Sequence, residues 1–154
     1  MINKEKIKHF LNNWGAHIVE IGKLNGDVHK QKQLAEKTIK KFYGYTDFEV
    51  LFTPTKAKEK PFRNTFDGAL SYFIGGNNNF PEDSGFAKKP WKNVQFDIHG
   101  IQIFDKVAIT MGHYFFVDKN DTELKAEFSF VIAENKNSDL KIILHHSSLP
   151  FNAK

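Results

Sequence analysis

The sequence contains no cysteine and a single arginine among its 154 residues. The absence of cysteine excludes disulfides, cysteine-based zinc sites and a cysteine nucleophile. The basic residues are almost all lysines spread along the chain, whereas nucleic-acid-binding domains usually gather Arg and Lys on one face with aromatic residues between them. We therefore expect no nucleic-acid partner, and the net charge of +4 is only a weak indication of anionic ligands.

Long apolar runs are also missing, and no stretch approaches the length of a membrane span. The first residues lack the apolar segment of a signal peptide. We therefore expect a cytoplasmic protein without a membrane partner, or a periplasmic one if a signal has been removed. Phe is abundant, with 16 residues, and a length of 154 residues with 40% hydrophobic composition fits one domain spanning residues 1–154.

Two hydrophobic patterns follow each other along the chain. Apolar residues at helical spacing predict helices between Asn3 and Gly22 and between Asp27 and Gly44. Phe48–Phe52 is predicted to be a short strand, Phe66–Ile74 a helical turn and Asn77–Pro90 a loop. The rest alternates with period two and predicts a meander of antiparallel strands. This order indicates an α+β fold in which the N-terminal helices pack on a strongly curved antiparallel sheet, forming a cone with an internal pocket.

The last predicted strand ends in the run His145-His146-Ser147-Ser148. Because side chains alternate between the two faces of a strand, only one His/Ser pair can face the interior. We assign the interior to His145 and Ser147. A hydrogen-bonded core pair without a catalytic role is the alternative, since a buried histidine needs partners.

Four further residues are candidates for binding a small polar ligand. Thr55 follows a strand, where a hydroxyl can face a cavity, and Tyr72 and Tyr114 place hydroxyls among apolar neighbours. Arg63 has a planar guanidinium that suits a carboxylate or carbonate-like anion, although a structural pair with an acidic residue would explain it equally well.

A metal site and a different pocket enzyme are two further alternatives. A three-histidine metal site would need His99, His113 and one of His145 or His146 to converge, and no spacing in the sequence requires this. A dehydratase or isomerase would need an Asp–His pair in the cavity, for which Asp97 and His99 are the candidates because they share a strand face.

In order and spacing, several fragments of the chain resemble the iota-class carbonic anhydrases. They are Leu51–Ala57, Phe62-Arg63, Gly68–Gly76, Glu82–Ala87, Met111–Phe116 and Leu144–Pro150. The resemblance implies a domain similar to the calcium/calmodulin-dependent protein kinase II association domain and the nuclear-transport-factor-2-like cone. It also implies reversible hydration of CO2 to bicarbonate and a homodimer. The sequence departs from the family pattern at Thr53, where Lys is expected, and at His113, where Asn is commoner.

The resemblance implies a reaction centre of hydroxyl groups that works without a metal, with zinc and manganese left open as alternatives. The catalytic residues that we expect are Thr55, Tyr72, Ser147 and His145. The residues expected to contact substrate are Arg63, Tyr114, Phe73 and Ser148. The proton acceptor stays open among His145, His146 and His113. The alternative function is a non-catalytic dimeric association module, or a module that binds a small anion.

Overall fold

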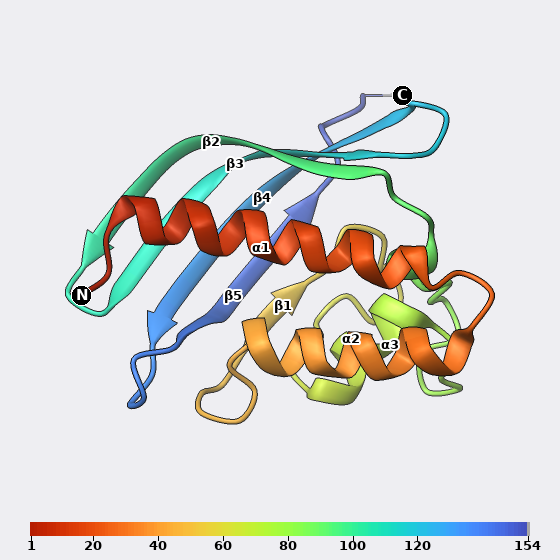
Figure 1. Cartoon of the computed structure of the whole chain (residues 1–154), viewed down its shortest axis with the longest axis horizontal. Coiled ribbons are helices and arrows are strands. Elements are labelled where there is room, and N and C mark those ends of the chain that lie inside the picture. Colours follow the sequence, from red (N-terminus) through yellow and green to blue (C-terminus); the bar gives the residue numbers. More distant parts are fainter. Residues whose placement is uncertain (154) are drawn as a thin grey trace.

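A computed structural model describes residues 1–153 as helices packed on a five-stranded sheet (Figure 1). The helices are α1 (Lys4–Lys23), α2 (Val28–Phe42), α3 (Phe66–Ile74) and the short 3-10 helix η1 (Phe86–Lys88). The strands are β1 (Leu51–Thr53), β2 (Asn93–Phe104), β3 (Val107–Val117), β4 (Glu123–Glu134) and β5 (Leu140–Ser148). The strand order is β1-β5-β4-β3-β2, and the helices lie on one face of the sheet.

The predicted helices form, and each begins at a capping side chain. Asn3, Asp27 and Thr65 accept hydrogen bonds from the backbone N–H three residues further on, at 2.9, 3.0 and 3.1 Å. Each bond satisfies one of the amide groups that lack a partner in the first turn of a helix. The ends of α1, α2 and α3 therefore agree with the sequence prediction to within a few residues.

The sheet is mixed, which corrects the prediction of a purely antiparallel one. Strands β2 to β5 form the expected antiparallel meander, but β1 pairs in parallel with β5. The physical reason is that β1 has no hairpin connection to its neighbour, because helix α3 and three strands intervene, so nothing requires it to run antiparallel to β5. The strand itself spans Leu51–Thr53 rather than Phe48–Phe52, and Pro54 follows it directly.

The core is unusually aromatic around Trp14 of α1. Its indole packs against the rings of Phe96, Tyr114, Phe116 and Phe130 from the sheet, with centroids 6.0 to 6.3 Å apart. Trp14 is 1% exposed, so this face of α1 is anchored on the strands that also carry the candidate site residues.

One glycine sets the path of the segment between α3 and β2. Gly85 has a φ of +85°, and a Cβ there would lie 2.5 Å from the carbonyl oxygen of Ile74 at the end of α3. Only glycine permits both this conformation and this close approach. The following residue, Phe86, is thereby directed onto the rings of Tyr72 and Phe73, each 5.2 Å away between centroids.

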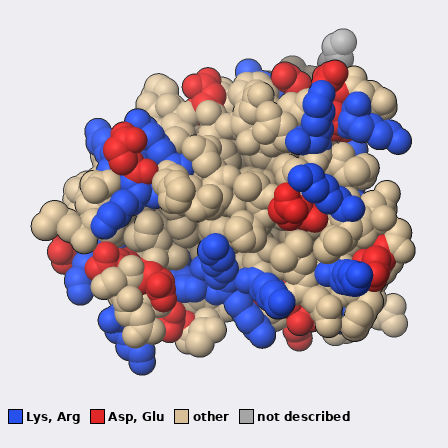
Figure 2. All heavy atoms as spheres, viewed as in Figure 1, with Lys and Arg blue, Asp and Glu red and all other residues tan. Residues whose placement is uncertain are grey.

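The surface carries charges of both signs. In the view of Figure 2, lysines gather over α2, and acidic side chains are scattered around them. The lysines of α2 are Lys30, Lys32, Lys37, Lys40 and Lys41. Among residues 1–153, no helix has the length and apolar character needed to cross a bilayer.

Candidate active site

A cavity of about 320 Å³ lies between α1, α3 and the inner face of the sheet. Four of its lining residues are Thr55 after β1, Tyr72 in α3, and His145 and Ser147 in β5. Tyr114 of β3 lies beside them. The fold therefore brings together hydroxyl groups that the sequence places up to 92 residues apart.

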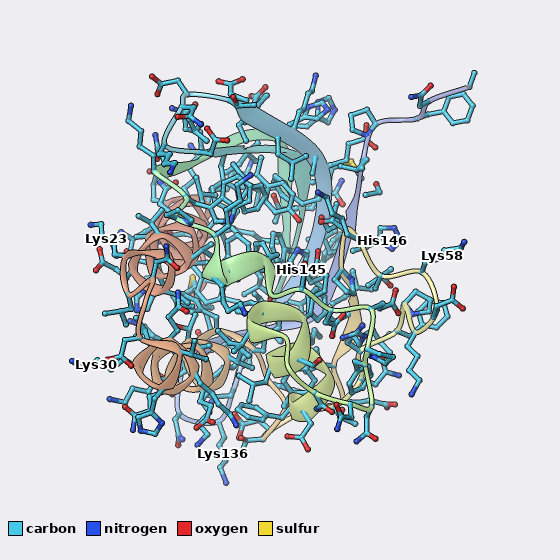
Figure 3. All side chains as sticks on the ribbon, turned by 90° about the vertical axis from the view of Figure 1, so that its right-hand side faces the viewer. Lys23, Lys30, Lys58, Lys136, His145 and His146 are labelled. Carbon is cyan, nitrogen blue, oxygen red and sulfur yellow. The ribbon has the colours of Figure 1, made fainter. Side chains whose placement is uncertain are left out.

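Strand β5 directs His145 and Ser147 inward, as the strand alternation predicted. They are 3% and 4% exposed, whereas the adjacent His146 is exposed. Figure 3 shows the two histidines on opposite sides of the ribbon, with His145 pointing toward the interior. Ser148 lies on the outer face with His146, so the expectation that Ser148 contacts substrate in this cavity is wrong.

The alternation does not extend to the start of β5. An irregularity in the pairing of β4 with β5 lies between Val131 and Ile132. The extra residue shifts the phase of β5, so that Ile142 is buried and Ile143 is not. Ile143 would share the face of His145 in a regular strand, but because of this shift it does not line the cavity.

The hydroxyl groups form a connected cluster. The Thr55 and Ser147 oxygens are 2.5 Å apart, and the Tyr114 hydroxyl donates to Ser147 Oγ. The backbone N–H of Lys56 donates to the Tyr72 hydroxyl at 3.2 Å. Among residues 1–153, no buried side-chain nitrogen or oxygen is left without a hydrogen-bond partner. The cluster is thus preorganised by the protein itself.

His145 is held by two tyrosines and two aromatic rings. Its Nδ1 is 2.9 Å from the Tyr43 hydroxyl and its Nε2 is 3.1 Å from the Tyr114 hydroxyl. The ring is stacked between Phe130 and Phe52, with centroid separations of 4.1 and 4.9 Å. Every polar edge and both faces of the imidazole are therefore occupied by protein groups.

This environment argues against His145 as the proton acceptor. Burial, with a smaller contribution from the neighbouring His146, lowers its pKa from 6.5 to about 3. Because desolvation penalises the charged form, the imidazole stays neutral near pH 7. A group with so low a pKa is too weak a base to take up a proton from water at neutral pH. His145 is better explained as a neutral group that orients the hydroxyl cluster.

The tyrosines of the cluster are likewise held in their neutral form. Burial raises the pKa of Tyr43, of Tyr114 and of Tyr72 above the usual value of 10.0. Hydrogen bonds from the Lys56 backbone and the Thr55 side chain oppose the effect at Tyr72. Near neutral pH these phenols are therefore hydrogen-bond donors rather than anions.

Two members of this network were missed by the sequence prediction. Trp14 Nε1 donates to the Tyr43 hydroxyl at 3.3 Å, and Tyr43 in turn contacts His145. Trp14 carried a signal, because it belongs to the apolar stripe of α1, but that stripe indicated only a core residue. Tyr43 lies at the end of α2, 102 residues from His145, and no local pattern connects the two.

The apolar part of the cavity is formed mainly by aromatic residues. Phe73 lines it, as expected, together with Phe52, Phe86 and Phe116. The mouth is more polar and carries charged side chains of both signs, namely Lys56, Lys89, Asp118 and Glu123. The cavity therefore combines a hydroxyl cluster, an aromatic wall and a charged rim.

Arg63 is a structural residue, which corrects the expectation that it binds substrate. Its guanidinium is fully buried and makes a two-pronged contact with the Asp83 carboxylate, at 2.6 and 2.7 Å. It also donates to the carbonyl oxygens of Lys60 and Gly68, and Ser71 donates to Asp83 at 2.5 Å. Arg63 is not among the residues that line the cavity. The acidic partner left open by the sequence is Asp83.

A second contact ties the Thr55 loop to the opposite wall of the cavity. The Glu82 carboxylate accepts backbone N–H bonds from Lys58, Glu59 and Lys60, at 2.6 to 3.1 Å. These bonds, that of Lys58 foremost, lower the pKa of Glu82. Glu82 and Asp83 thus connect the segment after β1 to the segment that continues through Ser84 and Gly85 into the cavity wall.

The other histidines lie outside the cavity. His99, His113 and His146 line a shallow depression on the outer face of the sheet, together with Asp97. Among residues 1–153, no group of three or more His, Asp or Glu side chains has a geometry that could hold a metal ion. The three-histidine site and the Asp97–His99 pair in the cavity are therefore both excluded by the geometry.

The buried pair of Arg63 and Asp83 leads to a stability prediction. Arg63→Met leaves a buried carboxylate without its partner, so we expect the free energy of unfolding to fall by about 3–5 kcal/mol. Urea denaturation at pH 7 measures this, with Lys58→Met at an exposed position as the control for loss of charge. Full stability of Arg63→Met would contradict the structural role.

The neutral state of His145 leads to a prediction for the dependence of stability on pH. The unfolded chain binds a proton at His145 below about pH 6.5, whereas the folded chain does so only near pH 3. The folded state therefore has its full free energy of unfolding above pH 6.5, where His145 is neutral in both states. Part of this free energy is lost as the pH falls toward 3, because only the unfolded chain takes up the proton. Between these limits the free energy of unfolding changes by about 1.4 kcal/mol per pH unit.

Urea denaturation between pH 7 and pH 4.5 measures this slope. His145→Gln should lower the slope relative to the wild type, and His146→Gln at the exposed neighbour should leave it unchanged. Equal slopes in the wild type and His145→Gln would show that the folded protein protonates this imidazole normally.

Comparison with known proteins places this site in a family. The sequence profile of the metal-independent carbonic anhydrases matches residues 5–149. The chain is 39% identical to a metal-independent carbonic anhydrase from Nostoc sp. (strain PCC 7120) over 141 residues, which is 90% of this chain and 69% of the relative.

Solved structures agree at the level of the whole fold. A crystal structure of a cyanobacterial iota-carbonic anhydrase complexed with bicarbonate superposes with a TM-score of 0.95 at 36% identity, covering 98% of this chain and 94% of the other. A calcium/calmodulin-dependent protein kinase II association domain from Xanthomonas campestris shares the fold alone, with a TM-score of 0.60 at 17% identity over 97% and 89% of the two chains. The chain therefore belongs to the family of metal-independent carbonic anhydrases.

Proposed function

We propose that the protein catalyses the reversible hydration of CO2 to bicarbonate and a proton, without a metal ion, in the cavity described above. The observation that carries this proposal is the convergence of the Thr55, Tyr72 and Ser147 hydroxyls in one cavity with an aromatic wall. Membership of the family supports it, and the cyanobacterial relative was crystallised with bicarbonate.

The two parts of the cavity match the two kinds of reactant. CO2 is apolar and fits beside Phe73 and the other aromatic rings, while water and bicarbonate need hydrogen-bonding partners. During attack of water on CO2, negative charge develops on the CO2 oxygens. Donors that are already positioned stabilise this charge without having to reorganise at the moment of reaction. Hydroxyls of Thr55 and Tyr72 are suited to this role.

Positioning is the second contribution. Ser147 and Thr55 can hold the attacking water close to the carbon of CO2, which removes much of the entropy loss of a reaction between two free molecules. The proton released on bicarbonate formation leaves through the polar mouth of the cavity. In the reverse direction a proton enters by the same route. It combines with the hydroxyl group that leaves bicarbonate, so that water and CO2 are formed.

The donor set explains how this chemistry proceeds without a metal. The interior of the cavity offers neutral hydroxyls and one neutral histidine, His145, whose two nitrogens are both engaged by tyrosines. Transition metals bind imidazole, thiolate or carboxylate groups with free lone pairs. The carboxylates of Asp118 and Glu123 lie at the mouth, and among residues 1–153 no three such groups have a geometry that could hold a metal ion. We propose that zinc and manganese have no role at this site.

Substitution of the hydroxyls tests the proposed function. Ser147→Ala and Thr55→Val each break the preorganised hydroxyl cluster that holds the water and the developing charge, so we expect the rate of CO2 hydration to fall about 10²–10³-fold. Stopped-flow measurement in buffer treated with a strong chelator provides the rate. Ser148→Ala, on the outer face of the same strand, is the matched control and should keep the wild-type rate.

Two outcomes would contradict the proposal. Wild-type rates in Ser147→Ala and Thr55→Val would remove the hydroxyl cluster from the reaction. Loss of activity on chelation, with recovery on adding zinc or manganese, would disprove the metal-free mechanism. A protein that associates but does not hydrate CO2 would favour a non-catalytic association module.

We further propose that the protein is a homodimer that associates through the outer face of the sheet. Four apolar residues form a continuous row there, since Ile109 pairs with Val131, Val131 with Leu144, and Leu144 with Leu51. Leu51 and Ile109 are 50% and 42% exposed, and Met111 next to the row is 52% exposed. Such a row on a face where polar residues are expected is typical of an interface.

The mass in solution tests this interface. The wild type should sediment with the mass of two 17.8 kDa chains, and Ile109→Glu should shift it toward one chain, because a buried unpaired carboxylate opposes association. Lys37→Glu on α2 is the control on the opposite side of the molecule. A monomeric wild type would contradict the proposal. The cone shape of the fold stays a prediction.

A further inference from the structure

We propose that Trp14 and Tyr43 are positioning residues that fix the direction of a buried hydrogen-bond chain, so that the hydroxyl proton at its far end points into the cavity. The inference rests on the proposed function, because it concerns how the same cavity selects an oxyanion. It also explains why the hydrogen-bond chain contains a histidine, His145, that does not act as a base.

The direction is set where the chain begins. The Trp14 indole N–H can only donate, so the Tyr43 oxygen is the acceptor of this 3.3 Å bond. The Tyr43 proton is then directed to His145 Nδ1, 2.9 Å away. Trp14, Tyr43 and His145 are only 1, 2 and 3% exposed, so an unpaired proton on any of them would be strongly unfavourable. Nδ1 is therefore an acceptor, and the neutral imidazole carries its proton on Nε2.

The same order continues from His145 to the cavity. Nε2–H donates to the Tyr114 oxygen at 3.1 Å, and the Tyr114 hydroxyl donates to Ser147 Oγ. Ser147 then donates to Thr55 Oγ1 across 2.5 Å. Each group accepts one proton and donates one, and the Thr55 hydroxyl donates in turn to the Tyr72 oxygen at the cavity.

A second, shorter chain ends at the same place. The Lys56 backbone N–H, which also can only donate, occupies the Tyr72 oxygen at 3.2 Å. Because the Tyr72 oxygen accepts from both Lys56 and Thr55, the Tyr72 proton is left for a ligand. Tyr72 lines the cavity, so a hydroxyl donor with a fixed direction faces whatever binds there. The site favours a ligand with acceptor oxygens, such as bicarbonate and the transition state that leads to it.

The beginning of the chain also determines where the reaction proton goes. A proton that entered at Thr55 would have to be passed back through each group, and the last group would have to accept it. The Trp14 nitrogen has no available lone pair and cannot do so. The chain is therefore closed at its inner end, and the proton leaves through the mouth of the cavity rather than through His145.

The tautomer of His145 provides a direct test that does not depend on activity. In protein labelled with ¹⁵N-histidine, the signals of His145 are identified by their loss in His145→Gln. We expect a neutral imidazole with the proton on Nε2 and an unprotonated Nδ1 across the neutral pH range. Protonation on Nδ1, or a doubly protonated ring at pH 7, would overturn the proposed direction.

Two substitutions test whether Trp14 and Tyr43 set this state. Trp14→Phe frees the Tyr43 hydroxyl to turn, and Tyr43→Phe removes the donor to Nδ1, so each should give a mixture of His145 tautomers. The concentration of bicarbonate needed for inhibition should rise about tenfold, and kcat/KM for CO2 should fall about tenfold. This is the effect expected from the loss of one hydrogen bond of ordinary strength. Trp91→Phe removes another indole at the cavity, bonded to the Phe86 carbonyl, and should leave the tautomer unchanged.

The outcomes separate this inference from the proposed function. If Trp14→Phe and Tyr43→Phe keep a single Nε2–H tautomer and the affinity of the wild type for bicarbonate, the two residues do not position the chain. If Trp14→Phe fails to fold, the wild-type spectrum still tests the tautomer of His145, and Tyr43→Phe still tests whether the chain is positioned from its inner end. If the wild type hydrates no CO2, the proposed function fails, whereas the tautomer and the binding of bicarbonate still test the direction of the chain.

Discussion

The contact on which the site depends is the burial of a neutral His145 between two tyrosines. Its imidazole links Tyr43, at the end of α2, to Tyr114 in the sheet, and Phe52 and Phe130 cover its two faces. Because the ring is dry and uncharged, it acts as a rigid spacer with one donor and one acceptor. The hydroxyls nearer the cavity inherit their orientation from it, and the aromatic core keeps water from competing for these bonds.

The surrounding loops hold the cluster in place by polar contacts of a different kind. Thr55 lies in an irregular segment after the three-residue strand β1, which by itself would position a side chain poorly. Glu82 binds three successive amides of that segment, and the buried pair of Arg63 and Asp83 holds the neighbouring wall. The Thr55 hydroxyl, although on a loop, is thus fixed nearly as firmly as one on a strand.

Much of the fold followed from local patterns in the sequence. The apolar stripe of α1, the capping residues and the strand alternation that directs His145 and Ser147 inward all depend on neighbours along the chain. What could not be predicted depends on distant pairing. The parallel partner of β1, the phase shift before Leu144, and the contact of Tyr43 with His145 involve residues brought together only by the folded sheet. The prediction that Arg63 binds substrate was wrong because its acidic partner, Asp83, lies 20 residues away in a loop and no local pattern connects the two.

The pairing of β1 with β5 has a consequence for the biogenesis of the protein. Thr55 is synthesised 92 residues before Ser147, yet the two oxygens form one pair and their strands are neighbours in the sheet. During synthesis, the first half of the chain cannot bury Phe52 or orient Thr55 until β5 has emerged and docked. The reaction centre therefore comes into being only when the final strand closes the sheet, and a chain shortened before that strand would lack the site entirely.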